Sequence, residues 1–105
     1  MSYQKALCAL ADPTRQAIIE ALRDAPQPVG ALATRFPISR PAISQHLKIL
    51  GDAGLVAAHP MGNRRYYSLA PQGVEALRTY LDTLWDDALA AFAREAASQS
   101  RKDIE

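Results

Sequence analysis

Four side chains that donate hydrogen bonds stand close together between positions 40 and 48. They are Arg40, Ser44, Gln45 and Lys48. Positions 40, 44 and 48 are four residues apart, and Gln45 follows Ser44, so on a helix all four project from one side. The stretch 38–51 contains no acidic residue, although an ordinary solvated helix face needs only to be polar. This side of the predicted helix is therefore suited to binding acceptors that carry negative charge.

Side chains of these types are the ones that proteins use on double-stranded DNA. Arg binds both acceptors of guanine, Gln pairs with adenine, and Lys and Ser reach phosphate oxygens. Two more arginines, Arg64 and Arg65, follow a predicted tight turn and would reach an adjacent minor groove or its phosphates. The expected DNA contacts are Ser39, Arg40, Pro41, Ser44, Gln45, Lys48, Arg64 and Arg65.

The residues 39–53 have the features of a helix that could present this face. Ser39 is a favourable N-cap residue, and Pro41 is tolerated in the first turn. Gly54 suits the left-handed conformation that ends many helices. The apolar positions Ile43, Leu47 and Leu50 are four and three apart and form the predicted buried stripe. The donors and the stripe occupy different sides, so one side anchors the helix while the other is free to bind.

The rest of the chain predicts a mainly α fold with a small β-hairpin. Helices are expected over 3–11, over 12–24 with Asp12 as N-cap, and over 29–36. After the helix 39–53, residues 55–69 alternate around "MGN" as two strands joined by a tight turn. A long helix follows from Pro71. Four helices, a hairpin wing and a fifth helix are the order of a winged helix-turn-helix domain.

The last helix carries an apolar seam that needs a partner helix. Its apolar residues from Val74 to Ala91 are alternately three and four apart. We expect a homodimer whose interface contains Tyr3, Leu7, Leu10, Leu77, Leu81, Leu84, Trp85, Ala88 and Phe92. Trp85 and Phe92 could alternatively line an effector pocket. Residues 1–96 are predicted to form the single domain, and 97–105 a polar, frayed tail.

Composition restricts the class of protein and its partners. The 105 residues suit one domain, and the net charge of +1 hides an uneven distribution. Residues 1–69 hold eight basic and four acidic residues, whereas 70–105 hold four and seven. The basic middle part would attract a polyanion. No apolar run approaches the roughly 20 residues of a membrane span, and no signal peptide is evident, so we expect a cytoplasmic protein.

The only cysteine, Cys8, cannot form an internal disulfide or a Cys-rich metal site. Its apolar neighbours Leu7 and Leu10 favour a buried and inert thiol. The alternative is a redox sensor in which the thiol meets its twin across the dimer axis.

Three stretches, "ALADPTRQAIIEAL", "ISRPAISQHLKILGDAGLV" and "GNRRYYSLAPQG", resemble the ArsR-type family of bacterial transcriptional repressors over roughly residues 5–92. The resemblance implies a homodimer, joined through its first and last helices, that binds double-stranded DNA at an inverted-repeat operator. It also implies release of the DNA when an effector binds.

The chain departs from the family's metal sensors. Members that bind metals through thiolates have a Cys-x-Cys pair in the third helix, but the matching region here is "VGALATRF". Zinc-type members use Asp and His on the last helix, which here has Asp82, Asp86 and Asp87 but no histidine. The chain therefore resembles the autorepressor branch without metal ligands. We expect no metal or other cofactor, and the effector, if any, is unknown.

Other interpretations of single residues are weaker. His46 borders the apolar side of its helix, so we expect it to pack between the turn helices with a hydrogen bond rather than to act as a base or ligand. Ser44 and His46 point apart on a helix, which argues against a catalytic triad and against an enzyme. His59 either touches DNA or is an exposed loop residue. The rival function is a protein-interaction module whose exposed helix docks on a partner protein.

Overall fold

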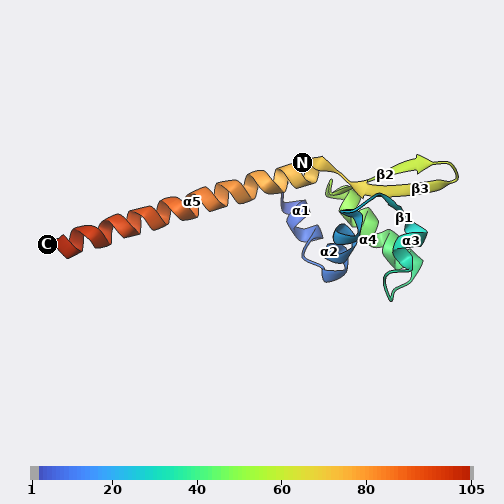
Figure 1. The fold of residues 1–105 in the computed structure, drawn as a ribbon, viewed down its shortest axis with the longest axis horizontal. Helices are drawn as coiled ribbons and strands as arrows, with labels where there is room; N and C mark the ends of the chain where they lie inside the picture. The colour runs from blue at the N-terminus through green and yellow to red at the C-terminus, as the bar shows by residue number, and fades with distance from the viewer. Residues whose placement is uncertain (1–2, 105) are drawn as a thin grey trace.

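One long helix, α5, projects from a group of shorter helices and a small sheet (Figure 1). The computed structural model of the chain describes residues 3–104, and the side chains of residues 3–100. In chain order its elements are α1 (Tyr3–Ala9), α2 (Pro13–Leu22), β1 (Gln27–Pro28), α3 (Val29–Ala33), α4 (Arg40–Asp52), β2 (Val56–Met61), β3 (Arg64–Leu69) and α5 (Pro71–Ile104). The predicted mainly α fold with a hairpin wing is confirmed, with one additional strand.

Two of the helices begin as their sequences predicted. Asp12 caps α2, because its Oδ2 accepts a hydrogen bond from the backbone N–H of Arg15 at 3.1 Å. Ser39 caps α4 in the same way through its Oγ, which accepts from the backbone N–H of Ala42 at 3.2 Å. In each helix the next or second position is proline, where no intrahelical N–H bond is lost. The cap at Ser39 therefore determines where the face of α4 begins.

The wing belongs to a three-stranded antiparallel sheet rather than to a hairpin alone. The sheet order is β1-β3-β2, and in it Gln27 pairs with Tyr67. No strand is predicted from the sequence for residues 25–28, because two residues are too short to show alternation and Gln27 pairs with a residue 40 positions away. The amide Nε2 of Gln27 also donates to the carbonyl oxygen of Ala21 at 2.6 Å, which ties β1 to the end of α2. The wing is thus attached to the rest of the domain through β3, the central strand of the sheet.

The core confirms the buried stripe of α4 and shows which side of α1 packs against the domain. The largest fully buried side chains are Ile18, Leu32, Ile43, Leu47, Leu50 and Leu55. From α1, however, Ala6 and Ala9 are buried, whereas Leu7 is 39% exposed. Small residues let α1 lie close to its neighbours, and the exposed Leu7 stays a predicted residue of the dimer interface.

The first turn of α5 lies directly against the end of α4. The backbone N–H of Gly73 donates to the carbonyl oxygen of Gly54 at 2.8 Å. A Cβ atom on Gly73 would lie 2.6 Å from the carbonyl oxygens of Ala53 and Gly54, so only glycine permits this approach. Gly54 itself has φ 74°, as predicted for the end of the helix. Further along, the ring of Tyr80 stacks on Tyr3 of α1, with centroids 4.1 Å apart.

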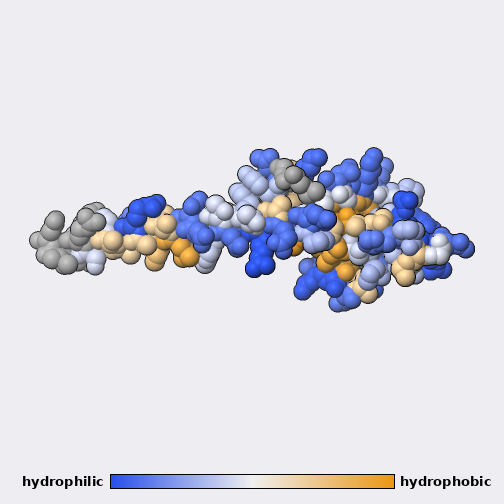
Figure 2. Space-filling model, turned by 90° about the horizontal axis from the view of Figure 1, so that it is seen from above, coloured by the Kyte–Doolittle hydropathy of each residue, from blue (hydrophilic) through white to orange (hydrophobic). Residues whose placement is uncertain are grey.

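Beyond residue 80, α5 leaves the body and its described side chains are almost all exposed. Every side chain from Leu81 to Ala97 is exposed, and apolar side chains lie uncovered along this part of the helix (Figure 2). The helix continues to Ile104, into the tail that the sequence analysis expected to fray. Residues 93–104 contain no proline or glycine and several strong helix formers, so nothing in them ends the helix. Glu105 lies outside the described residues.

Candidate nucleic-acid interface

The donor face of α4 is exposed in the structure, as its spacing predicted. Arg40, Ser44, Gln45 and Lys48 are all exposed. The opposite face is held in the core, where Ile43, Leu47 and Leu50 are at most 1% exposed. The donors therefore stand on a helix whose position is fixed by packing.

A groove of about 360 Å³ runs between α4 and the wing. We call it the helix–wing groove, and its polar lining consists of Ser44, Lys48 and Asp52 from α4 with Arg65 and Tyr67 from β3. Two residues of the donor face thus meet a wing arginine across one hollow. Asp52 is the single acid in the lining, and it lies at the C-terminal end of the helix.

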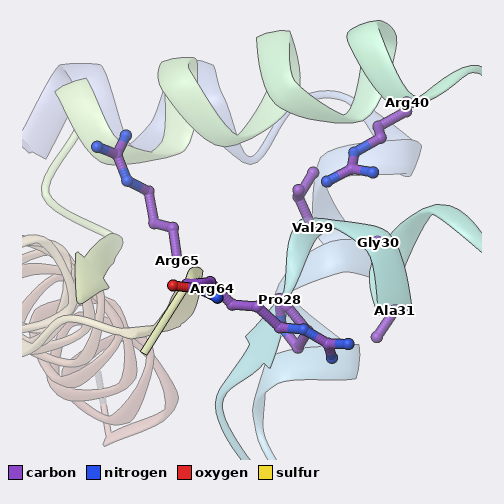
Figure 3. A pocket seen from close by; sticks show the side chains of 8 residues that line it. Pro28, Val29, Gly30, Ala31, Arg40, Arg64 and Arg65 are labelled. Carbon is purple, nitrogen blue, oxygen red and sulfur yellow. The ribbon is translucent and has the colours of Figure 1, made fainter. Parts of the chain in front are cut away.

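A second hollow, of about 490 Å³, adjoins the first because Arg65 lines both. We call it the arginine pocket, lined by Pro28, Val29, Gly30, Ala31, Arg40, Asn63, Arg64 and Arg65. In Figure 3, Arg40 points from α4 toward Val29 and Gly30, and Arg64 runs from β3 past Pro28 toward Ala31. Arg65 turns the other way, toward α4. No acidic residue lines this pocket.

The cations of both hollows have no partner among the side chains of residues 3–100. Among the side chains of residues 3–100, the ion pairs are Arg23 with Glu20 and Arg78 with Asp82, both remote from the two hollows. Arg40, Lys48, Arg64 and Arg65 make no salt bridge or side-chain hydrogen bond to any described residue. Unpaired cations around concave surfaces concentrate positive potential there and attract a polyanion.

The structure brings together most of the predicted contacts, but not all. Arg40, Ser44, Lys48, Arg64 and Arg65 line the two hollows. Gln45 is exposed beside them and lines neither. Ser39 acts as the cap of α4, and Pro41 is exposed in its first turn.

Residues 28–31 also line the arginine pocket, and they were not predicted from the sequence as part of the site. These residues are apolar or glycine, and their place beside the wing depends on the pairing of β1 with β3. No local pattern could have indicated it, because the pairing joins segments far apart in the chain.

His46 is half-buried and its hydrogen-bond partner comes from α2, not from the other helix of the turn pair. Arg15 Nη1 lies 3.5 Å from His46 Nδ1. The same guanidinium donates through Nε to the carbonyl oxygen of Ala9 at 2.6 Å and through Nη2 to that of Cys8 at 3.3 Å. Arg15 therefore connects the end of α1 to the donor helix, and His46 has a structural environment. His59 of the wing is exposed, with its Nε2 3.1 Å from Ser68 Oγ.

The expectation of a buried thiol is wrong for this chain, because Cys8 is exposed. Ala6 and Ala9 occupy the side of α1 that faces the core, which turns Cys8 outward. Within the described residues no three His, Cys, Asp or Glu side chains gather closely enough to hold a metal ion. No helix in the same part of the chain combines the length and the apolar content that crossing a bilayer requires.

The residues predicted for the dimer interface fall into two groups. Leu10 and Leu77 pack partly against the chain's own core, and Tyr3 is half-buried against Tyr80. The others are exposed, and they are Leu7, Leu81, Leu84, Trp85, Ala88 and Phe92. Trp85 and Phe92, at 64% and 72% exposure, line neither the helix–wing groove nor the arginine pocket.

Comparisons with known proteins agree with this arrangement. A family model described as a helix-turn-helix domain matches residues 10–58. The HTH-type transcriptional regulator Rv2034 of Mycobacterium tuberculosis is 53% identical over 93 residues, which cover 89% of this chain and 87% of the relative. The transcriptional repressor SdpR of Bacillus subtilis is 43% identical over 61 residues, covering 58% of this chain and 68% of that protein.

Solved structures give the same result. An ArsR-like transcriptional regulator from Rhodococcus sp. RHA1 has a TM-score of 0.74 and 34% identity, covering 88% of this chain and 90% of that one. The homodimeric winged helix-turn-helix DNA-binding domain of Mb0332 from Mycobacterium bovis has a TM-score of 0.65 and 30% identity, covering 80% and 78%. The family resemblance seen in the sequence is thereby confirmed, and this chain belongs to the ArsR family of transcriptional regulators.

Proposed function

We propose that the protein is a homodimeric repressor that binds a specific DNA sequence, with α4 in the major groove and the wing on the adjacent backbone. The observation that carries this proposal is the helix–wing groove, in which Ser44 and Lys48 of α4 face Arg65 of the wing. Donors and unpaired cations on a rigid exposed helix match the acceptors of base edges and phosphates. Gln45, exposed beside the groove, is suited to reading adenine.

The uncovered apolar side of α5 supports a dimer. Leu81, Leu84, Trp85, Leu89 and Phe92 are 48–72% exposed in the single chain. Apolar residues at this spacing on a helix are stabilised by packing against a second helix. Mb0332, which has the same fold, is homodimeric. Two-fold symmetry would place two α4 helices about 34 Å apart on the DNA, so we expect the operator to be an imperfect palindrome.

Repression without a metal signal is the finer part of the proposal. SdpR is named a transcriptional repressor, and a dimer covering a promoter would exclude other proteins from it. The regions that hold family metal ligands lack cysteine pairs and histidine in this chain. Transition metals bind tightly only where several such ligands converge. We therefore expect the affinity for DNA not to depend on added zinc.

The proposal is tested by selecting duplexes from a random library with the purified protein and sequencing those that it retains. The expected result is an imperfect palindrome, bound more tightly than a shuffled duplex of equal composition. A protein-interaction module would enrich no sequence and would bind no duplex even at low salt, which would overturn the proposal. Static light scattering at micromolar concentration, with an expected mass of two chains, tests the dimer separately.

A further inference from the structure

We infer that the arginine pocket holds one phosphate of the DNA backbone, bound by Arg40 from α4 and by Arg64 from the wing. Arg40 is then a residue that binds the backbone, not one that reads a base. The inference rests on the proposed function, because it assigns a part of the DNA to a part of that interface.

The direction of Arg40 is the first observation. Its guanidinium is turned back over the start of α3, so that a Cβ atom on Gly30 would lie 4.0 Å from Nη1. In Figure 3 the side chain points toward Val29 and Gly30. Arg40 does not line the helix–wing groove, where Ser44 and Lys48 lie. Although Arg40 shares the helical spacing of those two residues, it belongs to a different surface.

Arg64 reaches the arginine pocket from strand β3 of the wing, whereas Arg40 reaches it from α4. Its side chain leaves β3 and passes Pro28 toward Ala31, as Figure 3 shows. Its neighbour Arg65 is on the other face of the strand and turns toward α4. Alternation along β3 thus directs Arg64 into the arginine pocket alone, whereas Arg65 borders both hollows and turns toward the helix–wing groove. The register of the sheet holds this assignment, since Arg64 pairs with Met61 and Arg65 with Pro60.

The chemistry of the pocket fits a phosphate. Neither Arg40 nor Arg64 has an ion pair among the described residues, and no acid lines the pocket. Each guanidinium presents a planar set of donors that binds phosphate oxygens, and an anion between the two would also relieve their mutual repulsion. The lining offers no acidic acceptor for a base amino group. A contact built in this way is independent of sequence.

The pocket would also connect the two DNA-binding elements through the DNA. Arg40 stands at the first residue of α4 and Arg64 at the first residue of β3. A phosphate bound by both side chains holds the wing against the helix-turn-helix pair on a single DNA strand. The free energy of the two contacts is therefore coupled, and this coupling distinguishes one shared phosphate from two separate ones.

The test measures the salt dependence of binding to the selected duplex and to a shuffled one for four proteins. They are the parent, Arg40→Ala, Arg64→Ala and the double variant, with Arg23→Ala as a control for loss of charge away from the pocket. One phosphate contact contributes about 0.9 to the slope of log affinity against log salt. A shared phosphate predicts that the double variant lowers the slope by about 0.9, whereas separate phosphates predict about 1.8.

The affinity itself gives a second measurement. Each single variant should weaken both duplexes by the same factor, on the order of tenfold. The ratio between the selected and the shuffled duplex should stay that of the parent. Arg40→Lys, which keeps the charge, should recover part of the loss on both duplexes. Circular dichroism establishes that each variant is folded.

Three results would overturn the inference while leaving the proposed function intact. A collapse of the ratio in Arg40→Ala would make Arg40 a base-reading residue. A fall of about 1.8 in the slope of the double variant would mean two phosphates. Binding of inorganic phosphate that is lost in Arg64→Ala, while that variant binds both duplexes with the affinity and salt slope of the parent, would mean a site for a free anion. Failure of the parent to bind any duplex would instead refute the proposed function.

Discussion

The backbone N–H of Gly73 lies 2.8 Å from the carbonyl oxygen of Gly54, so the helix that extends from the body is joined directly to the end of the donor helix. The joint leaves no space for a side chain, because a Cβ on Gly73 would meet two carbonyl oxygens at 2.6 Å. The orientation of α5 relative to α4 thus depends on one glycine.

Replacing Gly73 by alanine should destabilise the protein. The added methyl group would force the first turn of α5 away from α4, with a cost of about 1–3 kcal/mol typical of overpacking. Urea unfolding measures the change. Gly51→Ala is the matched control, since a Cβ there would be 3.9 Å from its nearest neighbour and alanine favours a helix. Equal stability of Gly73→Ala and the parent would show that the joint yields easily.

Asp12 should make stability depend on pH in the acid range. The hydrogen bond from the backbone N–H of Arg15 lowers the pKa of the Asp12 carboxyl below its usual value. A lowered pKa in the folded state means that the stabilisation is complete above the unfolded-state pKa and is lost as the pH falls through the folded-state pKa. Asp12→Asn keeps a capping group without the charge. The parent should be more stable than this variant at neutral pH, and the difference should shrink in acid.

The contrast with Asp12→Ala separates the cap from the charge. Alanine removes the hydrogen-bond acceptor, so this variant should be less stable than Asp12→Asn at every pH. Unfolding curves of the three proteins at about pH 7 and about pH 3 supply the comparison. If the gap between parent and Asp12→Asn did not change with pH, the carboxylate would have no role beyond hydrogen bonding.

Lys48→Ala should weaken binding to every duplex. Lys48 lines the helix–wing groove without an acidic partner, and an ammonium group suits a phosphate contact. Loss of that contact should lower the slope of log affinity against log salt by about 0.9. Fluorescence anisotropy titrations over a range of salt concentrations measure it, with Arg23→Ala as the control. An unchanged slope would contradict the role of Lys48.

Gln45→Ala should reduce specificity more than affinity. Gln45 is exposed and lies outside both hollows, so it is free to enter the major groove. Loss of one bidentate contact to a base costs about 1–3 kcal/mol of discrimination. We expect weaker binding to the selected duplex with little change for the shuffled one. Equal weakening of both duplexes would instead assign Gln45 to the backbone.

Trp85→Glu should dissociate the proposed dimer. A charge within the apolar side of α5 would be buried in the interface and leave the helices unpaired. Sedimentation velocity should show a single chain where the parent shows two, and the palindromic duplex should be bound less tightly. Asp86→Ala changes the side of the helix opposite Leu84 and Ala88, so it should leave the mass unchanged. A dimeric Trp85→Glu variant would exclude this stripe from the interface.

Local signals predicted much of the fold. Capping residues determined the starts of α2 and α4, and the turn at Gly62, which has φ 63°, joins β2 to β3 as expected. What the sequence did not indicate depends on contacts between distant segments. The two-residue strand β1 exists through its pairing with β3, and the close packing of α1 through Ala6 and Ala9 follows from its neighbours. Both features depend on tertiary contacts and leave no periodic pattern in the sequence.

In the candidate site, too, local spacing was predictable from the sequence and contacts between distant segments were not. Helical spacing grouped Arg40 with Ser44 and Lys48, yet the structure separates Arg40 into the arginine pocket. Spacing determines from which side of a helix a residue leaves, but the direction of a long side chain depends on what surrounds it. Here the surroundings are the start of α3 and the wing, which lie elsewhere in the sequence.

The joint between Gly73 and Gly54 would determine which spacing of operator half-sites the protein can bind. In the proposed dimer, α5 supplies the contact between subunits and α4 the contact with DNA, and one rigid hydrogen-bonded turn connects them. The separation of the two donor helices is then preset within each chain before DNA arrives. The protein would therefore bind half-sites tightly at one spacing only. The same half-sites moved apart by a few base pairs would be bound weakly.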